Sequence, residues 1–175
     1  MNHAPERRFA LRRQQLIPRP SHEVFPFFQD LSNLELLTPR WLGFRIVRRP
    51  VEPLAEGSRI EYRLRLFGVP LRWHTVIERF DPGWGFVDVQ ERGPYREWVH
   101  CHLFAAAPVS AGGTPPADSD PTAAERTVPG VLMEDRVDYR LPFGRLGLLA
   151  APFVRLQLTA IFAHRGQEVR RRFRP

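Results

Sequence analysis

The strongest constraint on the fold is a series of segments in which apolar and charged side chains alternate from one residue to the next. The clearest case is 59–66, where every even position is apolar and every odd position is charged. A repeat of two puts these sets on opposite sides of an extended strand, so that one side can be buried while the other meets water. Residues 71–78 largely alternate in the same way after a turn at Gly68-Val69-Pro70, which predicts an antiparallel hairpin.

Turn signals divide much of the remaining chain into further strands and two short helices. The other predicted strands are 7–17, 84–91, 95–107 and 131–141. Two short helices are expected after the first strand: one begins at Ser21, which would cap it, and the other spans about 31–37 and ends before Pro39. The sequence therefore predicts an antiparallel sheet of about six to seven strands.

The chain ends in one long predicted helix. A set of residues that is apolar except for its last member recurs at steps of three and four, at Leu146, Leu149, Phe153, Leu156, Ala160 and His164. This spacing is typical of an amphipathic helix, and we expect these residues to form its buried face. Pro152 should kink the helix, and the arginines near its end, Arg170, Arg171, Arg172 and Arg174, complement the negative end of the helix dipole.

The chain is expected to form a single domain, residues 1–175, because 175 residues with 43% hydrophobic content can bury one sizeable core. The segment 108–130 is different, since it consists mainly of Pro, Ala, Gly, Ser, Thr and Asp. Such a composition cannot pack well, and we predict a flexible hairpin loop there.

The charge is strongly positive, at +7, but all 26 basic residues are arginine. We interpret this bias as the product of a GC-rich genome, so that the charge is weaker evidence for a nucleic-acid partner. The alternative is a nucleic-acid-binding module that uses the row Arg59, Arg63 and Arg65 with the C-terminal arginines. Against it, glutamates are interleaved with these arginines and no nucleic-acid motif is present, so we expect no nucleic-acid partner.

Several features favour a cytoplasmic protein. Cys101 is the only cysteine, and the N-terminus lacks the pattern of a secretory signal. No membrane span is expected, because the longest apolar stretch, Leu146–Val154, is about half of the roughly 20 residues required. A monomer or a homodimer is expected.

The order of elements and several motifs together resemble the SRPBCC superfamily, the START-like helix-grip domains that include the birch-pollen allergen and polyketide cyclases. The closer similarity is to small bacterial ligand-binding members. The residues that carry it are Leu31-x-x-Leu34 with Thr38-Pro39-x-Trp41, Gly57-x-x-Ile60-x-Tyr62, Gly68-x-Pro70-x-x-Trp73-x-Thr75, Phe86-Val87-Asp88-x-Gln90-x-x-Gly93-Pro94-Tyr95-x-x-Trp98-x-His100-x-His102-x-Phe104, Asp135-x-Val137-x-Tyr139-x-Leu141-Pro142 and Ile161-Phe162-x-x-Arg165. The resemblance implies an α+β helix-grip fold, in which a curved sheet wraps around the C-terminal helix and leaves a cavity for an apolar or aromatic small molecule.

Alternation places a group of polar side chains toward this cavity. His100 and His102 share a strand face with Trp98, and Asp88 and Gln90 alternate in the same manner on the neighbouring strand. If the two faces align, these groups converge in an aromatic environment, as in many small-molecule sites. The candidate ligand-binding residues are Trp41, Tyr62, Trp73, Asp88, Gln90, Trp98, His100, His102, Tyr139 and Phe153.

The two histidines allow other interpretations. They can simply be core residues whose hydrogen bonds are satisfied by carboxylates or backbone. As a metal site they supply only two ligands, and a third from Asp88, Asp135 or His74 is not fixed by the sequence, so no metal or cofactor is expected. As a catalytic site, His100 or His102 would be the general acid or base of a cyclase or dehydratase, with Asp88 as the other catalytic candidate. Binding without chemistry is the favoured function, and this enzyme is the alternative.

Overall fold

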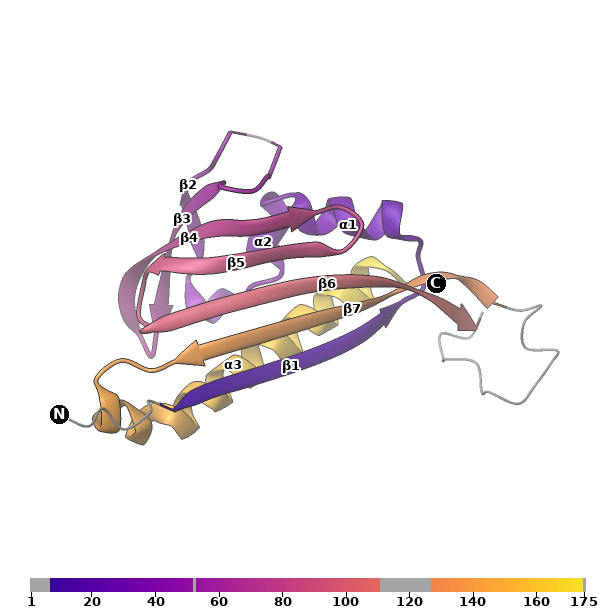
Figure 1. The fold of residues 1–175 in the computed structure, drawn as a ribbon. Coiled ribbons are helices and arrows are strands. Elements are labelled where there is room, and N and C mark those ends of the chain that lie inside the picture. Colours follow the sequence, from indigo (N-terminus) through magenta and orange to yellow (C-terminus); the bar gives the residue numbers. More distant parts are fainter. Residues whose placement is uncertain (1–6, 52, 111–126, 175) are drawn as a thin grey trace.

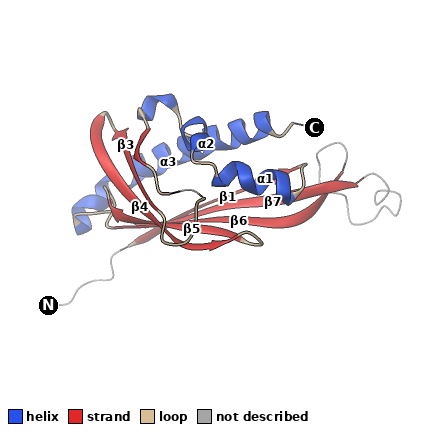
Figure 2. Ribbon diagram, turned by 90° about the horizontal axis from the view of Figure 1, so that it is seen from above, coloured by secondary structure: helices blue, strands red, loops and turns tan. Residues whose placement is uncertain are grey.

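The computed structural model describes residues 7–51, 53–110 and 127–174, and it has the predicted α+β helix-grip fold (Figure 1). Seven antiparallel strands form one curved sheet in the order β1-β7-β6-β5-β4-β3-β2. The elements are β1 (Arg8–Ile17), α1 (Ser21–Gln29), α2 (Ser32–Leu36), the 3-10 turn η1 (Arg40–Leu42), β2 (Arg45–Arg48), β3 (Arg59–Leu66), β4 (Val69–Asp81), β5 (Gly85–Arg92), β6 (Glu97–Ser110), β7 (Thr127–Arg140) and α3 (Gly144–Arg172). Figure 2 shows the helices gathered on one side of the sheet, with α3 along its length.

The alternating segments form strands where the pattern predicts them, and β3 has the predicted bounds. The turn after it is shorter than expected, because β4 already begins at Val69. Phe67 and Gly68 form this two-residue turn with positive φ angles of 51° and 82°. Two positive φ angles are characteristic of the type I′ turn, whose twist matches that of the flanking strands.

The hairpin between β6 and β7 corrects the prediction of a loop at 108–130. Both ends of that segment are strand: Pro108 pairs with Pro129, and Val109 pairs with Val128. At Gly130 a small residue is required because neighbouring atoms pack closely around it. A Cβ on Gly130 would lie 2.1 Å from Cγ2 of Val109, which is itself fully buried. The remainder of the predicted loop, 111–126, lies outside the described residues.

The two predicted short helices are present as α1 and α2, and η1 follows them without having been predicted. Ser21 does not cap α1, since the N-cap residue is Pro20 and no side chain caps the helix. Instead, α1 is held by its aromatic side chains. Phe25 and Phe28 are buried against Phe104 of β6, with ring centroids 5.3 and 5.1 Å apart. These contacts fix α1 over one end of the sheet.

The long helix α3 is present, but its buried face is not the predicted one. Leu149 is 74% exposed and Phe153 is 64% exposed. The residues that face the sheet are Gly147, Ala151, Val154, Leu158, Phe162, Arg165 and Val169. The first half of α3 is apolar on more than one side, so periodicity alone does not select the inner face. Close packing selects part of it, because a Cβ on Gly147 would lie 2.0 Å from the carbonyl oxygen of Pro142.

The helix continues through Pro152, and Arg170, Arg171 and Arg172 lie in its last turn as expected. By length and composition α3 could also cross a membrane, which the stretch Leu146–Val154 did not suggest. In this structure its inner face packs against the sheet.

Candidate functional site

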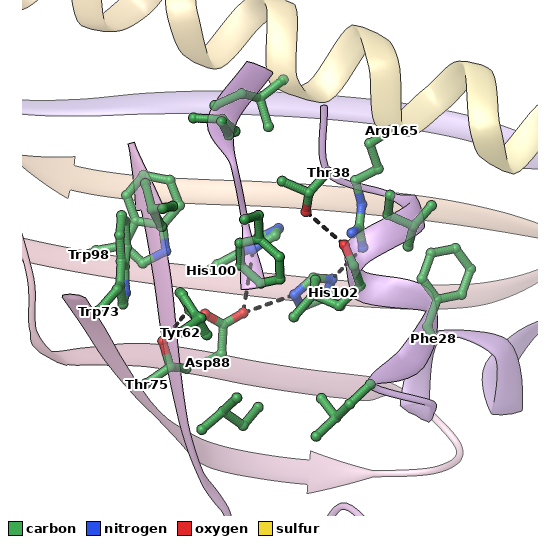
Figure 3. Close-up of a pocket in the computed structure, with 18 of the residues that line it drawn as sticks. Phe28, Thr38, Tyr62, Trp73, Thr75, Asp88, Trp98, His100, His102 and Arg165 are labelled. Atoms are coloured by element: carbon green, nitrogen blue, oxygen red, sulfur yellow. Dashed lines mark hydrogen bonds and ion pairs between the residues drawn. The ribbon is translucent and has the colours of Figure 1, made fainter. Parts of the chain in front are cut away.

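A cavity of about 170 Å³ lies between the sheet and the helices (Figure 3). Strands β3, β4, β5 and β6 form one wall, and side chains from α1, α2, η1 and α3 close the other. Most of the lining is apolar or aromatic. Figure 3 shows Trp73 and Trp98 together at one end and Phe28 at the opposite end.

Strand pairing explains why acidic and imidazole side chains meet inside this apolar space. Asp88 of β5 lies directly opposite His100 of β6, and His102 lies opposite Asp135 of β7. Because side chains alternate between the two faces, all four project to the same side of the sheet. Arg165 of α3 reaches this group from the facing helix and donates from Nε to Asp135 Oδ2 at 3.0 Å.

We call Asp88, His100, His102, Asp135 and Arg165 the polar cluster. Its imidazoles bridge its two carboxylates. His102 Nε2 lies 2.9 Å from Asp88 Oδ2, and His102 Nδ1 lies 3.1 Å from Asp135 Oδ1. His100 Nδ1 lies 3.4 Å from Asp88 Oδ2, and its Nε2 lies 3.1 Å from Asp135 Oδ1. A second nitrogen of Arg165, Nη2, lies 3.1 Å from His102 Nδ1.

The cluster is almost withdrawn from water, and this shifts the pKa values of its members. Burial alone would raise the pKa of Asp135, but Arg165 and the two imidazoles outweigh it and hold that pKa well below its usual range. Burial, reinforced by the neighbouring His102, lowers the pKa of His100. Burial also opposes protonation of His102, but hydrogen bonds to Asp135 and Asp88 prevail and raise its pKa. The two imidazoles are therefore driven to different protonation states.

One polar group in the cavity lacks a partner. Trp73 is 6% exposed, and within the described part of the chain its buried Nε1 has no hydrogen-bond acceptor. A buried N–H without an acceptor costs about 1–3 kcal/mol, so an acceptor in the cavity would be stabilised there. The neighbouring Tyr62 hydroxyl, by contrast, is hydrogen-bonded to Thr75.

Six of the ten residues predicted to bind a ligand line the cavity: Tyr62, Trp73, Asp88, Trp98, His100 and His102. They come from the strands whose alternation was clear in the sequence. Their role in binding stays a prediction.

The other four do not line the cavity, each for a physical reason. Trp41 lies in η1 and is 54% exposed, and Phe153 lies on the outer side of α3. Gln90 is used by the turn that follows it, because its amide donates to Tyr95 O at 2.7 Å and accepts from Tyr95 N at 3.3 Å. Tyr139 is fully buried in the aromatic core, where its ring stacks on Phe9.

Sequence reasoning missed Arg165 as a site residue. It follows Leu158 and Phe162 at steps of four and three on the true inner face of α3. An arginine in the middle of an apolar helix face indicates a buried ionic partner, but this signal appears only when the face is chosen correctly. The role of Asp135 was only an alternative in the sequence, and the strand register places it beside His102.

Comparison with known proteins identifies the fold and little more. TTHA0849 from Thermus thermophilus is similar with a TM-score of 0.59 and 17% identity, covering 92% of this chain and 97% of the other. The ginseng major latex-like protein 151 from Panax ginseng has a TM-score of 0.57 and 11% identity, and the match covers 96% of this chain and 99% of the other. Ara h 8.0201 has a TM-score of 0.53 and 13% identity, and the match covers 93% of this chain and 97% of the other. No model of a protein family matches the sequence, and no curated protein does.

Ara h 8.0201 and the ginseng protein are Bet v 1-like proteins, a group within the SRPBCC superfamily. At these low identities the likeness shows a shared helix-grip fold, and it carries no information about a shared activity. The helix-grip fold that the resemblance implied is confirmed, and membership of the superfamily and of its small bacterial subgroup stays a prediction.

Proposed function

We propose that this helix-grip protein binds a small apolar or aromatic molecule in the cavity between its sheet and α3. The observation that carries the proposal is a largely apolar cavity that contains an unpartnered donor, Trp73 Nε1, within the described chain. Apolar walls supply affinity, and a few polar groups fix the orientation of the ligand.

The volume limits the size of the ligand. A cavity of about 150 Å³ lined by apolar side chains is enough to bind benzene, and the cavity here measures about 170 Å³. A ligand with roughly one aromatic ring or a short branched chain therefore fits without rearrangement. A long-chain fatty acid or a sterol requires the helices to move outward.

The expected affinity is modest. Six buried carbons at about 0.8 kcal/mol each give about 5 kcal/mol, which corresponds to a Kd near 0.2 mM before any hydrogen bond is counted. An acceptor placed against Trp73 Nε1 should strengthen binding by about 0.5–1.5 kcal/mol. Monocyclic compounds with one carbonyl or ether oxygen are thus the favoured class.

The proposal is tested by calorimetric titration of monocyclic aromatics, with and without an acceptor, alongside fatty acids and sterols. We expect Leu158→Trp to abolish binding, because Leu158 lines the cavity and the indole would fill it. Leu149→Trp is the matched control, since Leu149 lies on the same helix but is exposed. Equal binding by the two variants, or no binding of any compound to the wild type, would overturn the proposal.

A second candidate function is general acid or base catalysis of the cyclase or dehydratase kind. It is favoured by the cavity position of His100, whose pKa is lowered by burial, so that its imidazole is unprotonated and able to accept a proton. Compounds that bind are incubated with wild type and with His100→Gln, and products are followed by mass spectrometry. Turnover that the variant loses supports catalysis, whereas unchanged compounds support binding alone.

The nucleic-acid alternative gains little support. Arg59, which begins the predicted arginine row, is ion-paired with Glu91, and Arg72 is paired with Glu61. Part of the positive charge is thus neutralised within the sheet itself. A cytoplasmic location and a monomeric or homodimeric state stay predictions.

A further inference from the structure

We propose that His100, His102 and Asp88 form a binding site for one divalent transition-metal ion, open toward the cavity. One ligand atom from each residue lies within 4.8 Å of the other two. These three residues come from two adjacent strands, β5 and β6, so the rigid ladder of the sheet fixes their relative positions. The site was not expected from the sequence, where a third ligand could not be chosen.

The separations between Asp88 and the two imidazoles already suit an ion. Asp88 Oδ2 lies 2.9 Å from His102 Nε2 and 3.4 Å from His100 Nδ1. With metal–ligand bonds of about 2.1 Å, two ligand atoms are about 3.0 Å apart at a right angle and about 3.4 Å apart at a tetrahedral angle. An ion bound by Asp88 Oδ2 and either imidazole nitrogen therefore needs little movement of those two side chains.

The far nitrogens of both imidazoles are held in the way that metal-binding histidines usually are. His100 Nε2 and His102 Nδ1 each lie 3.1 Å from Asp135 Oδ1. A carboxylate that accepts from the far nitrogen of a histidine fixes its ring orientation and raises its basicity as a ligand. Asp135 thus directs the other nitrogen of each ring toward Asp88.

Arg165 completes this support. It is paired with Asp135 at 3.0 Å and keeps that carboxylate ionised inside the protein. Its Nη2 also lies 3.1 Å from His102 Nδ1. When His102 Nδ1 donates to Asp135, it cannot also accept a hydrogen bond from Arg165 Nη2. We therefore expect the distance between Arg165 Nη2 and His102 Nδ1 to lengthen when the metal binds.

The other candidate ligands are excluded by their positions. His74 contacts Glu61 at 4.0 Å and lies opposite Glu61 in the β3/β4 ladder, outside the cavity lining. Asp135 is engaged by the far nitrogens of the two imidazoles. Asp88 is therefore the third ligand that the geometry selects.

The ligand set indicates the kind of ion. Two imidazoles with one carboxylate suit zinc, iron, cobalt or nickel, whereas calcium and magnesium prefer sites made of oxygen alone. Three protein ligands leave at least one coordination position free, as in catalytic rather than structural zinc sites. That position faces the cavity, and the idea that an oxygen of the cavity ligand occupies it rests on the proposed function. The metal site itself does not.

The test is titration of tag-free, chelator-treated protein with Co²⁺ alone, followed by visible absorption and calorimetry. We expect one equivalent to bind with d–d bands of a nitrogen and oxygen site, and Zn²⁺ to displace it. His100→Gln and Asp88→Asn should each weaken binding at least tenfold. Asp135→Asn should weaken binding by about 10–100-fold, because it removes the support of both rings.

His74→Gln is the control and should bind Co²⁺ as the wild type does. Near-UV circular dichroism establishes whether each variant is folded. If His100→Gln is unfolded, the test rests on Asp88→Asn. The absence of stoichiometric Co²⁺ binding by the wild type, or unchanged binding by folded Asp88→Asn, would show that the cluster is only an ion-pair network. Because no organic ligand is present, this result is independent of the proposed function.

Discussion

The ion pair between Arg165 and Asp135 should be among the most important single contacts for stability, and Arg165→Met tests this. The two side chains are each only 8% exposed, and Arg165 Nε lies 3.0 Å from Asp135 Oδ2. Methionine fills a similar volume along the helix but leaves the carboxylate without its cation. Within the described part of the chain, Asp135 then keeps the two imidazoles as partners, and its carboxylate stays buried.

Breaking one side of a buried ion pair costs about 3–5 kcal/mol, because the remaining charge stays buried and uncompensated. A domain of this size has a total stability of about 5–15 kcal/mol. The substitution should therefore remove at least about a fifth of that stability. In a chain of 150–250 residues a loss of 3 kcal/mol lowers Tm by about 6–12 °C.

Equilibrium unfolding in urea measures the loss, with Arg171→Met as the matched control. Arg171 lies on the same helix and pairs with Glu168, but its side chain is 65% exposed. Exposed pairs contribute about 0–1 kcal/mol, so the control should change little. If Arg165→Met costs less than about 1 kcal/mol, water reaches the cluster and the reasoning from buried charge is refuted.

Three further predictions concern packing and pH. Leu158→Ala should cost about 2–5 kcal/mol in urea unfolding, since Leu158 is 4% exposed, whereas exposed Leu149→Ala should cost under about 0.5 kcal/mol; equal losses would show that the inner face of α3 is misassigned. Gly130→Ala should cost about 1–3 kcal/mol, because the new Cβ would lie 2.1 Å from Val109 Cγ2, and a neutral effect on Tm would contradict this. The lowered pKa of Asp135 means that its contribution to stability is fully present above about pH 4 and is lost as the pH falls through the folded-state pKa. Urea midpoints at several acidic pH values should therefore fall more steeply for the wild type than for Asp135→Asn, and parallel curves would oppose that assignment.

The sheet could be predicted from the sequence because the alternation of apolar and polar residues within each strand depends only on neighbouring positions. In β3 each residue shows by its own polarity which face it occupies, and the strand has the predicted bounds. The same alternation assigns His100 and His102 to one face of their strand, and the strand register brings Asp88 to that face. The ends of β6 and β7 at 108–110 and 127–130 were missed, because proline and glycine there were interpreted as loop residues, although Gly130 allows close packing of the two strands.

The side of α3 that packs against the sheet could not be predicted in the same way. In α3 apolar residues occur on more than one side, so the pattern favoured Leu149 and Phe153, while the buried side is the one that contains Leu158, Phe162 and Arg165. That choice depends on contacts between elements distant in sequence. Arg165 was missed and Phe153 was wrongly placed in the cavity for this one reason.

The position of β1 at the edge of the sheet has a consequence for synthesis on the ribosome. Its one sheet neighbour is β7, and the contact between Arg12 and Glu134 joins residues 122 positions apart. At about 5–20 residues per second, the first strand waits roughly 6–25 s for its partner to be made. Throughout that interval α3 is also absent, so the cavity wall of the growing sheet is open to water. We expect the nascent chain to form the β2–β6 meander first and to depend on chaperones until its two ends meet.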